Sequence, residues 1–255
     1  MWGGYPPLIS KKSDSIWLND LVFVGSYQED NEVYLFFREI SIETQFTEKM
    51  YYSRIARVCT QDRGGNSAVL ESTWTSFLKA RLDCSFRGDF TFHFNYLQDV
   101  ARVVEGKKIF YYAIFTTGDH EMPASAVCRF DLDHIRDNFD NCLLKLTKCP
   151  WSPIADSQRG GCSASDSRRL SHDNLNFIKS HPLMYEPVVG EDPLFTLVRK
   201  RYRLKTLVVR TSQHHTVVFA GTDDGRVLKL VARQESPSVL LYNVRVIGQP
   251  ITNMR

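Results

Sequence analysis

Apolar and polar residues alternate along short runs of this chain, and turn-forming residues separate the runs. The clearest run is residues 73–84 (TWTSFLKARLDC), where every second residue is apolar or small and Phe77 is the exception. A period of two predicts a strand with one buried side and one solvent-facing side. Residues 52–59 alternate less cleanly, because Arg54 and Arg57 fall on opposite sides. A loop rich in glycine and polar residues joins the two runs, as expected for a turn between strands.

Further extended runs repeat this arrangement along the chain. The predicted strands are 21–25, 32–39, 52–60 and 73–84, then 97–104, 109–116 and 125–130, and finally 204–209, 216–221, 226–231 and 239–247. The residues themselves do not repeat, but groups of about four short strands do. Repeated four-strand units are typical of β-propeller blades, and an ordinary β-sandwich fits the pattern equally well.

A long polar segment from Asp131 to about Lys200 interrupts the second group of strands. Its centre reads DSQRGGCSASDSRRLSHDN, and the prolines that follow prevent long regular structure. One short helix is predicted over residues 174–179, capped by Asp173 or Asn174. A loop of this length inside a compact domain either has a function or argues against the strand assignment.

Composition narrows the classes of protein to which the chain can belong. Of its 255 residues, 43% are hydrophobic and 24% are charged, as in a soluble globular protein. The net charge of +3 is too small and too scattered to predict nucleic-acid binding. The sequence has no apolar run of about 18 residues, so no membrane span is predicted. The first residues lack the basic-then-apolar layout of a signal peptide.

No residue pattern predicts catalysis, a metal site or a bound cofactor. The Gly-x-Ser-x-Gly turn of serine hydrolases is absent. The pair His214–His215 precedes an apolar strand, so we expect it to be structural or solvated. Asp224 and Gly225 lie between apolar runs and predict a hairpin turn. The cysteines lack the Cys-x-x-Cys spacing of zinc sites.

The cysteines leave two interpretations open. An even number is compatible with three disulfides formed in an oxidising compartment, and buried thiols explain the spacing equally well. The six residues are Cys59, Cys84, Cys128, Cys142, Cys149 and Cys162. Spacing alone does not choose between the two.

Eight segments, in order over about residues 17–231, resemble the sema domain of semaphorins. The longest contains SRIARVC, a Gly-Gly loop and WTSFLKARLDC, over residues 53–84. The others are WLN, VYLFFRE, LQDV, IFYYAIFTT, SAVC, NFIKSHPLM and GTDDGRVLK. Any one segment would be a weak signal, but their common order makes the chain similar to a semaphorin over most of its length.

The resemblance implies an all-β fold, a seven-bladed β-propeller of which this chain covers about three blades and an insertion. The implied partial sema domain occupies residues 1–255, with blades at 21–84, 94–199 and 203–248, an insertion at 131–192 and the start of a further blade at 250–255. Residues 195–199 would supply the last strand of the second blade. We therefore expect a fragment or a truncated gene model. By itself it should be marginally stable or aggregation-prone, because an open arc leaves blade faces uncovered.

The resemblance also implies how the cysteines pair. The implied pairs are Cys59 with Cys162, which would tie the insertion to the first blade, and Cys84 with Cys128. Cys142 and Cys149 match no general pair of the family, and their spacing permits a small additional disulfide. Such disulfides imply an extracellular protein, secreted or at the cell surface, whose signal peptide lies upstream of residue 1.

By resemblance, the protein is an extracellular signalling ligand that binds a plexin receptor in axon guidance and cell migration. Receptor contact is expected from the loop at residues 40–50, and the candidate residues are Arg38, Glu39, Glu43, Glu48 and Lys49. A solvated charged loop without a partner explains these residues equally well.

Semaphorins also act as homodimers, so the insertion is expected to help form a dimer interface. The candidate residues are Phe177, Ile178 and Met184, which could instead pack the insertion on its own blade. Two other functions stay open. Plexin-type receptors carry sema domains as well, although FLKARL and NFIKSHPLM resemble semaphorins more closely. A propeller enzyme is the third possibility.

Overall fold

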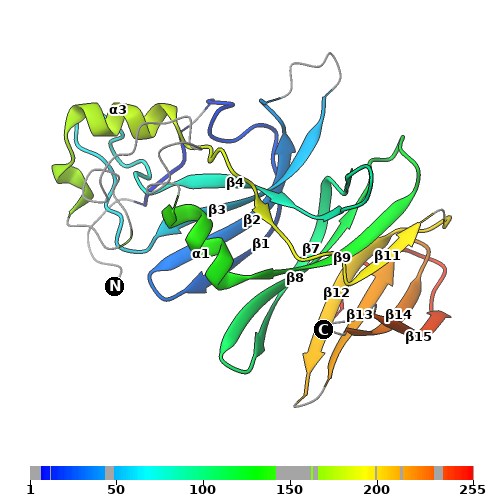
Figure 1. Ribbon diagram of the computed structural model, residues 1–255. Helices are drawn as coiled ribbons and strands as arrows, with labels where there is room; N and C mark the ends of the chain where they lie inside the picture. The colour runs from blue at the N-terminus through cyan, green and yellow to red at the C-terminus, as the bar shows by residue number, and fades with distance from the viewer. Residues whose placement is uncertain are drawn as a thin grey trace. The chain divides into compact units, whose positions relative to one another are not determined.

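The chain folds mainly into antiparallel strands in the computed structural model (Figure 1). The structure describes residues 7–11, 13–43, 49–141, 162, 166–198, 200–212, 215–232 and 238–254. Two compact units are present. Unit 1 comprises Met1–Met50, Arg54–Arg81 and Asn138–Pro187, and unit 2 comprises Tyr51–Ser53, Leu82–Asp137 and Val188–Arg255. The all-β character expected from the alternating pattern is therefore confirmed.

Four adjacent strands of a five-stranded sheet lie mainly in unit 1. They are β1 (Val22–Glu29), β2 (Glu32–Ile40), β3 (Tyr51–Cys59) and β4 (Leu78–Asp83), although the ends of β3 and β4 are grouped with unit 2. A tight turn with Asp30 in the left-handed region (φ 54°) joins β1 to β2. This turn lets β1 continue to Glu29, beyond the predicted end at residue 25.

An aromatic stack forms the core of unit 1. The rings of Trp17 and Phe77 lie 5.1 Å apart and nearly parallel, and both side chains are buried. Phe37, Ala56 and Val58 pack in the same cluster. Trp17 also donates a hydrogen bond from Nε1 to the backbone oxygen of Lys179 (2.8 Å). Burying each large aromatic ring contributes roughly 2–3 kcal/mol, so this cluster is a main source of stability for the unit.

The predicted strand at 73–84 begins only at Leu78, and the physical reason is a carboxylate. Asp62 Oδ2 accepts hydrogen bonds from the backbone N–H groups of Thr75 (2.8 Å) and Ser76 (2.7 Å). Backbone donors that bind a side chain are not free to pair with a neighbouring strand. The alternating pattern therefore overestimated this strand at its start.

The helices differ from the prediction in two ways. Helix α3 (His172–Ser180) contains the predicted 174–179, but Ser171 caps it, accepting the N–H of Asn174 (3.3 Å). Helix α1 (Leu132–Asn141) was not predicted at all. Its buried residues Leu132, Ile135 and Phe139 have helical spacing, hidden in a polar segment. A short 3₁₀ turn, η1, covers Ser167–Arg169.

Unit 2 contains two antiparallel four-stranded sheets. In the first, β7 (Tyr96–Glu105), β8 (Lys108–Thr116) and β9 (Ala124–Asp131) lie side by side, and β11 (Phe195–Val198) pairs with β9. In the second, the order follows the chain through β12 (Leu204–Thr211), β13 (Thr216–Thr222), β14 (Arg226–Ala232) and β15 (Val239–Arg245). These strands match the predicted ranges, including the late strand at 195–199.

Side chains of both sheets build one core in unit 2. The cluster includes Phe110, Tyr112 and Ile114 from β8 together with Leu228 and Leu230 from β14. The last strand contrasts with this core, because all the residues of β15 are exposed. Residues 250–254 form no strand.

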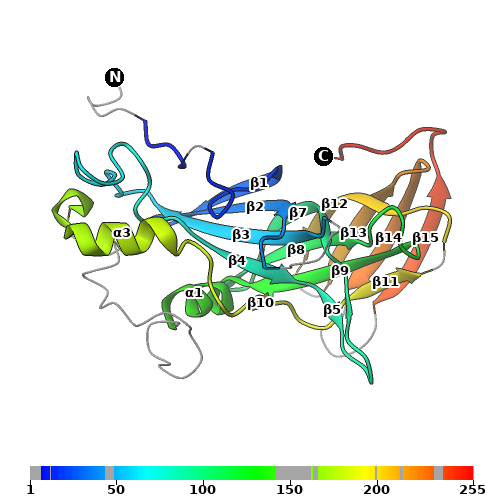
Figure 2. The same cartoon turned by 90° about the horizontal axis from the view of Figure 1, so that it is seen from above.

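Three short strands complete unit 2. Strand β5 (Ser85–Phe86) pairs with β6 (Phe92–His93) as a hairpin, which extends away from the other strands of its unit (Figure 2). Strand β10 (Val188–Val189) runs parallel to the end of β4, with Val188 opposite Leu82. The sequence pattern predicted none of the three, since each is only two residues long.

Candidate functional site: the loop after β2 and the disulfide region

The charged loop that follows β2 starts on a buried carboxylate. The side chain of Glu39 is 0% exposed. Its Oε1 accepts hydrogen bonds from Arg54 Nε (2.9 Å) and Lys79 Nζ (2.5 Å), and its Oε2 accepts the backbone N–H of Asn19 (3.1 Å). Glu39 is therefore held inside unit 1 and not at its surface.

Arg54 joins this buried carboxylate to the loop itself. Its Nη1 and Nη2 donate to the two oxygens of Glu43, at 2.8 Å and 2.5 Å. This is the two-pronged geometry in which a guanidinium binds a carboxylate most strongly. Ser41 adds to it by donating from Oγ to Glu43 Oε2 (2.8 Å). Glu39, Glu43, Arg54 and Lys79 together are called the ion cluster below.

The charges of the ion cluster shift one another's pKa values. Burial works against the charged form of Glu43, but the hydrogen bonds and charge of Arg54 outweigh it and lower the pKa of that carboxyl to about 2. Burial lowers the pKa of Lys79, and the neighbouring Glu39 only partly offsets this. Within the cluster, Arg54 therefore favours the charged form of Glu43, and burial disfavours the charged form of Lys79.

A buried ion cluster stabilises the fold only while it is complete. Removing charges from water costs several kcal/mol each, and the paired geometry offsets that cost. Loss of one partner leaves an uncompensated buried charge and costs about 3–5 kcal/mol. Arg54 carries most of this dependence, since it touches both carboxylates.

The remaining candidates for receptor contact are Arg38, Glu48 and Lys49. Arg38 is half-buried on β2, where successive side chains point to opposite faces, so it lies on the face away from Glu39. Lys49 is exposed near the end of the loop, where Ser41 N–H donates to Met50 O (2.7 Å). Glu48 lies outside the described residues.

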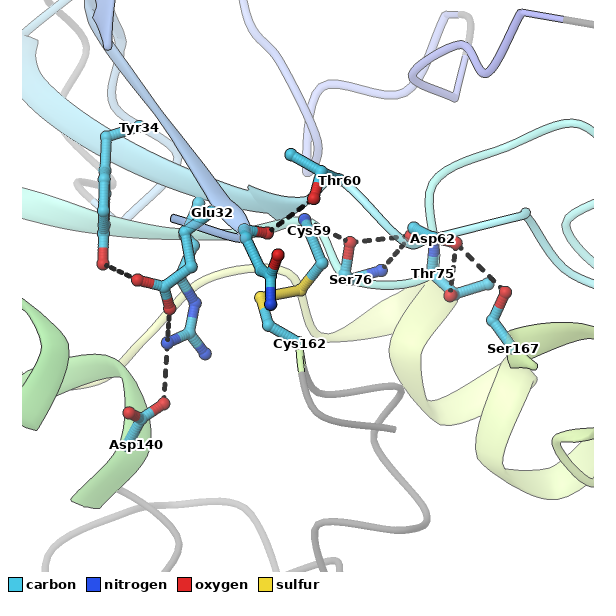
Figure 3. The surroundings of a disulfide bond; sticks show 12 residues. Glu32, Tyr34, Cys59, Thr60, Asp62, Thr75, Ser76, Asp140, Cys162 and Ser167 are labelled. Carbon is cyan, nitrogen blue, oxygen red and sulfur yellow. Dashed lines mark hydrogen bonds and ion pairs between the residues drawn. A yellow bond between two sulfur atoms is a disulfide. The ribbon is translucent and has the colours of Figure 1, made fainter. Parts of the chain in front are cut away.

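The disulfide between Cys59 and Cys162 ties the end of β3 to the insertion, as the resemblance implied (Figure 3). Asp62 organises the loop beside it. Besides the N–H groups of Thr75 and Ser76, it accepts the N–H of Gly64 at Oδ1 (2.8 Å). The hydroxyl of Ser167, in the insertion, lies 3.2 Å from the same oxygen. Hydrogen bonds to Asp62 therefore hold the loop and the insertion together next to the disulfide.

A second set of charges fixes helix α1 on the other side of the disulfide. Arg57 Nη1 donates to Glu32 Oε1 (3.0 Å) and to Asp140 Oδ1 (2.6 Å). Its guanidinium also lies 5.1 Å from the centre of the Phe139 ring, a favourable cation–π distance. Figure 3 shows Glu32 and Asp140 with Tyr34, whose hydroxyl donates to Glu32 Oε2 (2.8 Å). These contacts hold helix α1, at the start of the insertion, against β2 and β3.

Two of the three candidate dimer residues are buried in unit 1. Ile178 is 7% exposed and Met184 is 4% exposed. Phe177 stacks on His181, with 4.3 Å between the ring centres. The burial of Ile178 and Met184 is compatible with the second expectation, that they pack the insertion on its own blade, and the dimer role stays a prediction.

The second disulfide lies in unit 2, between Cys84 and Cys128. It is the other pair that the resemblance implied, and both cysteines are fully buried. Cys142 and Cys149 lie outside the described residues.

Sequence reasoning missed the residues that organise the site. It noted Arg54 and Arg57 only as irregularities in an alternating strand. A charged residue at an inward position of a strand must find a partner, so both positions signalled buried ion pairs. Nothing in the sequence identified the partners, which are Glu39 and Glu43 for Arg54 and Glu32 and Asp140 for Arg57, because they meet only in the folded chain.

The described residues offer neither a membrane span nor a metal cluster. No helix among them is long and apolar enough to cross a membrane. No group of three or more His, Cys, Asp or Glu residues in the described ranges could hold a metal ion.

Comparison with known proteins gives concordant matches. A family profile described as Sema domain matches residues 97–255. Human Semaphorin-6B is 41% identical over 251 residues, which cover 91% of this chain and 28% of that protein. The chain therefore spans little more than a quarter of the length of that relative.

Solved structures agree with the sequence comparison. Drosophila Plexin A in complex with Semaphorin 1b includes a chain that is 35% identical, with a TM-score of 0.81 over 94% of this chain and 52% of that chain. Drosophila Semaphorin 1a, extracellular domains 1–2, is 34% identical, with a TM-score of 0.84 over 97% of this chain and 54% of that chain. With the family profile matching more than half of its residues, the chain belongs to the Sema domain family and is a relative of the semaphorins.

Proposed function

We propose that this chain is part of a semaphorin-like extracellular ligand that binds a plexin receptor in axon guidance or cell migration. The observation that carries the proposal is the likeness to the structure of Drosophila Plexin A in complex with Semaphorin 1b. The two disulfides support an extracellular location, because disulfides persist in oxidising compartments. Binding, and not catalysis, is the role of the chain in this proposal.

The proposed fold of the whole domain is a seven-bladed propeller, with about three blades in this chain. The grouping of strands supports it. β1–β4, then β7–β9 with β11, and then β12–β15 each form an antiparallel row of four, which is the composition of a blade. In this proposal the blades occupy residues 21–84, 94–199 and 203–248, and the three rows of strands support it.

The proposed receptor contact is the outer part of the loop after β2. Lys49 is exposed and Glu48 is its neighbour, so these two residues are the ones to test. Glu39 and Glu43 act differently in the proposal. Their carboxylates bind Arg54 and fix the start of the loop, so they position the contact residues and do not themselves reach the receptor.

The test is the affinity of the complete protein for a plexin ectodomain. We expect the double variant Glu48→Lys/Lys49→Glu to bind at least about tenfold more weakly, a loss of about 1.4 kcal/mol. Lys107→Glu is the matched control, because Lys107 is an exposed lysine in the turn between β7 and β8. Equal plexin affinity of the double variant and the control would show that this loop does not contact the receptor.

Homodimer formation belongs to the same proposal and needs its own measurement. Sedimentation of the complete protein should give a dimer mass. Ile178 and Met184 are buried, so we expect their truncation to alanine to lower the free energy of unfolding of unit 1. We expect its effect on the dimer dissociation constant to be smaller. A monomer at all practical concentrations would contradict this part of the proposal.

A further inference from the structure

The hairpin at residues 85–93 presents an Arg-Gly-Asp tripeptide at its tip. Ser85 pairs with His93 and Phe86 pairs with Phe92, so Arg87–Thr91 form the turn. Every residue of the turn is exposed. Phe90, which follows the tripeptide within the turn, has 91% of its surface exposed. Figure 2 shows the hairpin extending away from the other strands of unit 2.

Both charged groups of the tripeptide lack a partner among the residues that the structure describes. Neither the Arg87 guanidinium nor the Asp89 carboxylate has a hydrogen bond or an ion pair within the described part of the chain. Elsewhere in this protein, arginine and aspartate two residues apart bind each other. Asp166 pairs with Arg168 (2.6 Å) and Asp224 pairs with Arg226 (2.9 Å).

The turn differs from those two pairs in the order of its charged residues. Arg87 and Asp89 have the same spacing in the opposite order, and they form no ion pair with each other in the described structure. Two opposite charges that do not neutralise each other are available to an outside partner.

The base of the hairpin is fixed. Cys84, next to β5, is bonded to Cys128, and Phe94 N–H donates to Cys84 O (2.9 Å). Asp83 binds both strands, because it accepts from Ser85 Oγ (3.1 Å) and lies 2.7 Å from His93 Nδ1. A turn on a fixed base loses less conformational entropy when it binds a partner.

The fold does not explain the glycine between the two charges. A methyl group added at Gly88 would meet its nearest neighbours at 3.7 Å (Phe86) and 3.9 Å (Phe90 O), which is ordinary van der Waals contact. The residue also lies outside the left-handed region where glycine is required. Close approach of a partner is a reason for glycine that the fold itself does not supply.

The chemistry of the tripeptide selects the class of partner. The two Cα atoms that carry the charges are at most about 7 Å apart along the chain. A carboxylate oxygen is a preferred ligand for Mg²⁺ or Mn²⁺, and a guanidinium binds an acidic pocket through two hydrogen bonds. An exposed aromatic ring beside them adds an apolar contact.

We propose that this hairpin binds a metal-dependent adhesion receptor of the integrin type. Such a receptor places a divalent cation against the Asp89 carboxylate and an acidic pocket against the Arg87 guanidinium. At ordinary residue frequencies the tripeptide occurs by chance roughly once in several thousand residues, so its presence alone is weak support. The projecting turn, the free charges and the fixed base together carry the inference, which is independent of plexin binding.

The experiment measures binding of the complete secreted protein to recombinant integrin ectodomains that recognise Arg-Gly-Asp peptides. With Mg²⁺ or Mn²⁺ present we expect saturable binding, which EDTA abolishes and a short Arg-Gly-Asp peptide inhibits. Asp89→Glu keeps the charge but moves the carboxylate, so we expect at least about tenfold weaker binding. Asp119→Glu is the matched control, an exposed aspartate in another loop of unit 2, and should bind normally.

Three outcomes would overturn the inference: no binding of the unaltered protein to any ectodomain of the panel, binding that survives EDTA, or equal binding of Asp89→Glu. Gly88→Ala is a second test. The fold has room for the added methyl group, so this variant should fold normally and bind the integrin more weakly. Full binding of Gly88→Ala would also contradict the inference. Plexin affinity of the same samples separates the two proposals, since Asp89→Glu should leave it unchanged.

Discussion

The loop after β2 and the hairpin at residues 85–93 both carry arginine or lysine with acidic residues, yet they use these charges in different ways. In the first, Arg54 is fully buried and binds Glu39 and Glu43. In the second, Arg87 and Asp89 are exposed and have no partner among the described residues. Charges of the first kind determine the shape of a loop, and charges of the second kind are available for recognition. The difference lies in burial and pairing and not in residue type.

The strongest test of this comparison removes the central charge of the ion cluster. Arg54→Met should lower the free energy of unfolding by about 3–5 kcal/mol, because Glu39 stays buried and keeps only Lys79 as a charged partner among the described residues. Denaturant unfolding of the complete protein measures this loss. Arg210→Met is the control, since Arg210 is exposed on β12, and it should change stability by less than about 0.5 kcal/mol. Equal stability of the two variants would show that the cluster does not support the fold.

A smaller effect is expected from the pH dependence of Glu43. Its carboxyl has a pKa of about 2 in the folded protein against an ordinary value of 4.5, so the unfolded chain takes up its proton first as the pH falls. The stabilising contribution is complete above pH 4.5 and is lost between pH 4.5 and 2. Solvent screening of this partly exposed side chain limits it to about 1–2 kcal/mol.

The measurement compares the unaltered protein with Glu43→Gln, which cannot titrate at this position. The stability difference between them should be largest at neutral pH and should disappear toward pH 2. A difference that stays constant from pH 6 to pH 2 would mean that the ion pair with Arg54 does not act through the charge of Glu43.

The smallest effect on stability is expected at the hairpin. The free energy of unfolding of the double variant Arg87→Ala/Asp89→Ala should lie within about 0.5 kcal/mol of that of the unaltered protein, because neither side chain has a partner in the described part of the chain. Thermal and denaturant unfolding check this. A loss above about 1 kcal/mol would show that these charges serve the fold, and the contrast with the ion cluster would fail.

Much of the fold could be predicted from the sequence, because alternation depends on local burial. Strands β7, β8 and β12–β14 appear within about two residues of their predicted bounds. Helix α1 was missed because its three buried apolar residues lie among aspartates and asparagines, which lower the average hydrophobicity of the segment. The start of β4 was misplaced because Asp62, far away in the loop, takes its backbone donors.

The candidate site was harder to predict. Acidic residues at 39 and 43 have the same appearance in the sequence as exposed receptor contacts, and only the folded chain shows that Arg54 and Lys79 approach them. The hairpin illustrates the opposite case. The tripeptide is visible in the sequence, but its significance depends on a projecting turn, and strands of two residues leave no periodic signal.

The two disulfides have a consequence for how this chain matures. Cys84 and Cys128 lie between Cys59 and Cys162 in the sequence, so the pairs are nested. During synthesis Cys59 and Cys84 emerge from the ribosome before Cys128 and Cys162. These first two cysteines do not pair with each other in the native structure. At about 5–20 residues per second, the 44 residues from Cys84 to Cys128 take roughly 2–9 seconds to synthesise. During that time the two early thiols can oxidise together, and the wrong bond then has to be exchanged. We therefore expect an isomerase to control the yield of native protein in the secretory pathway.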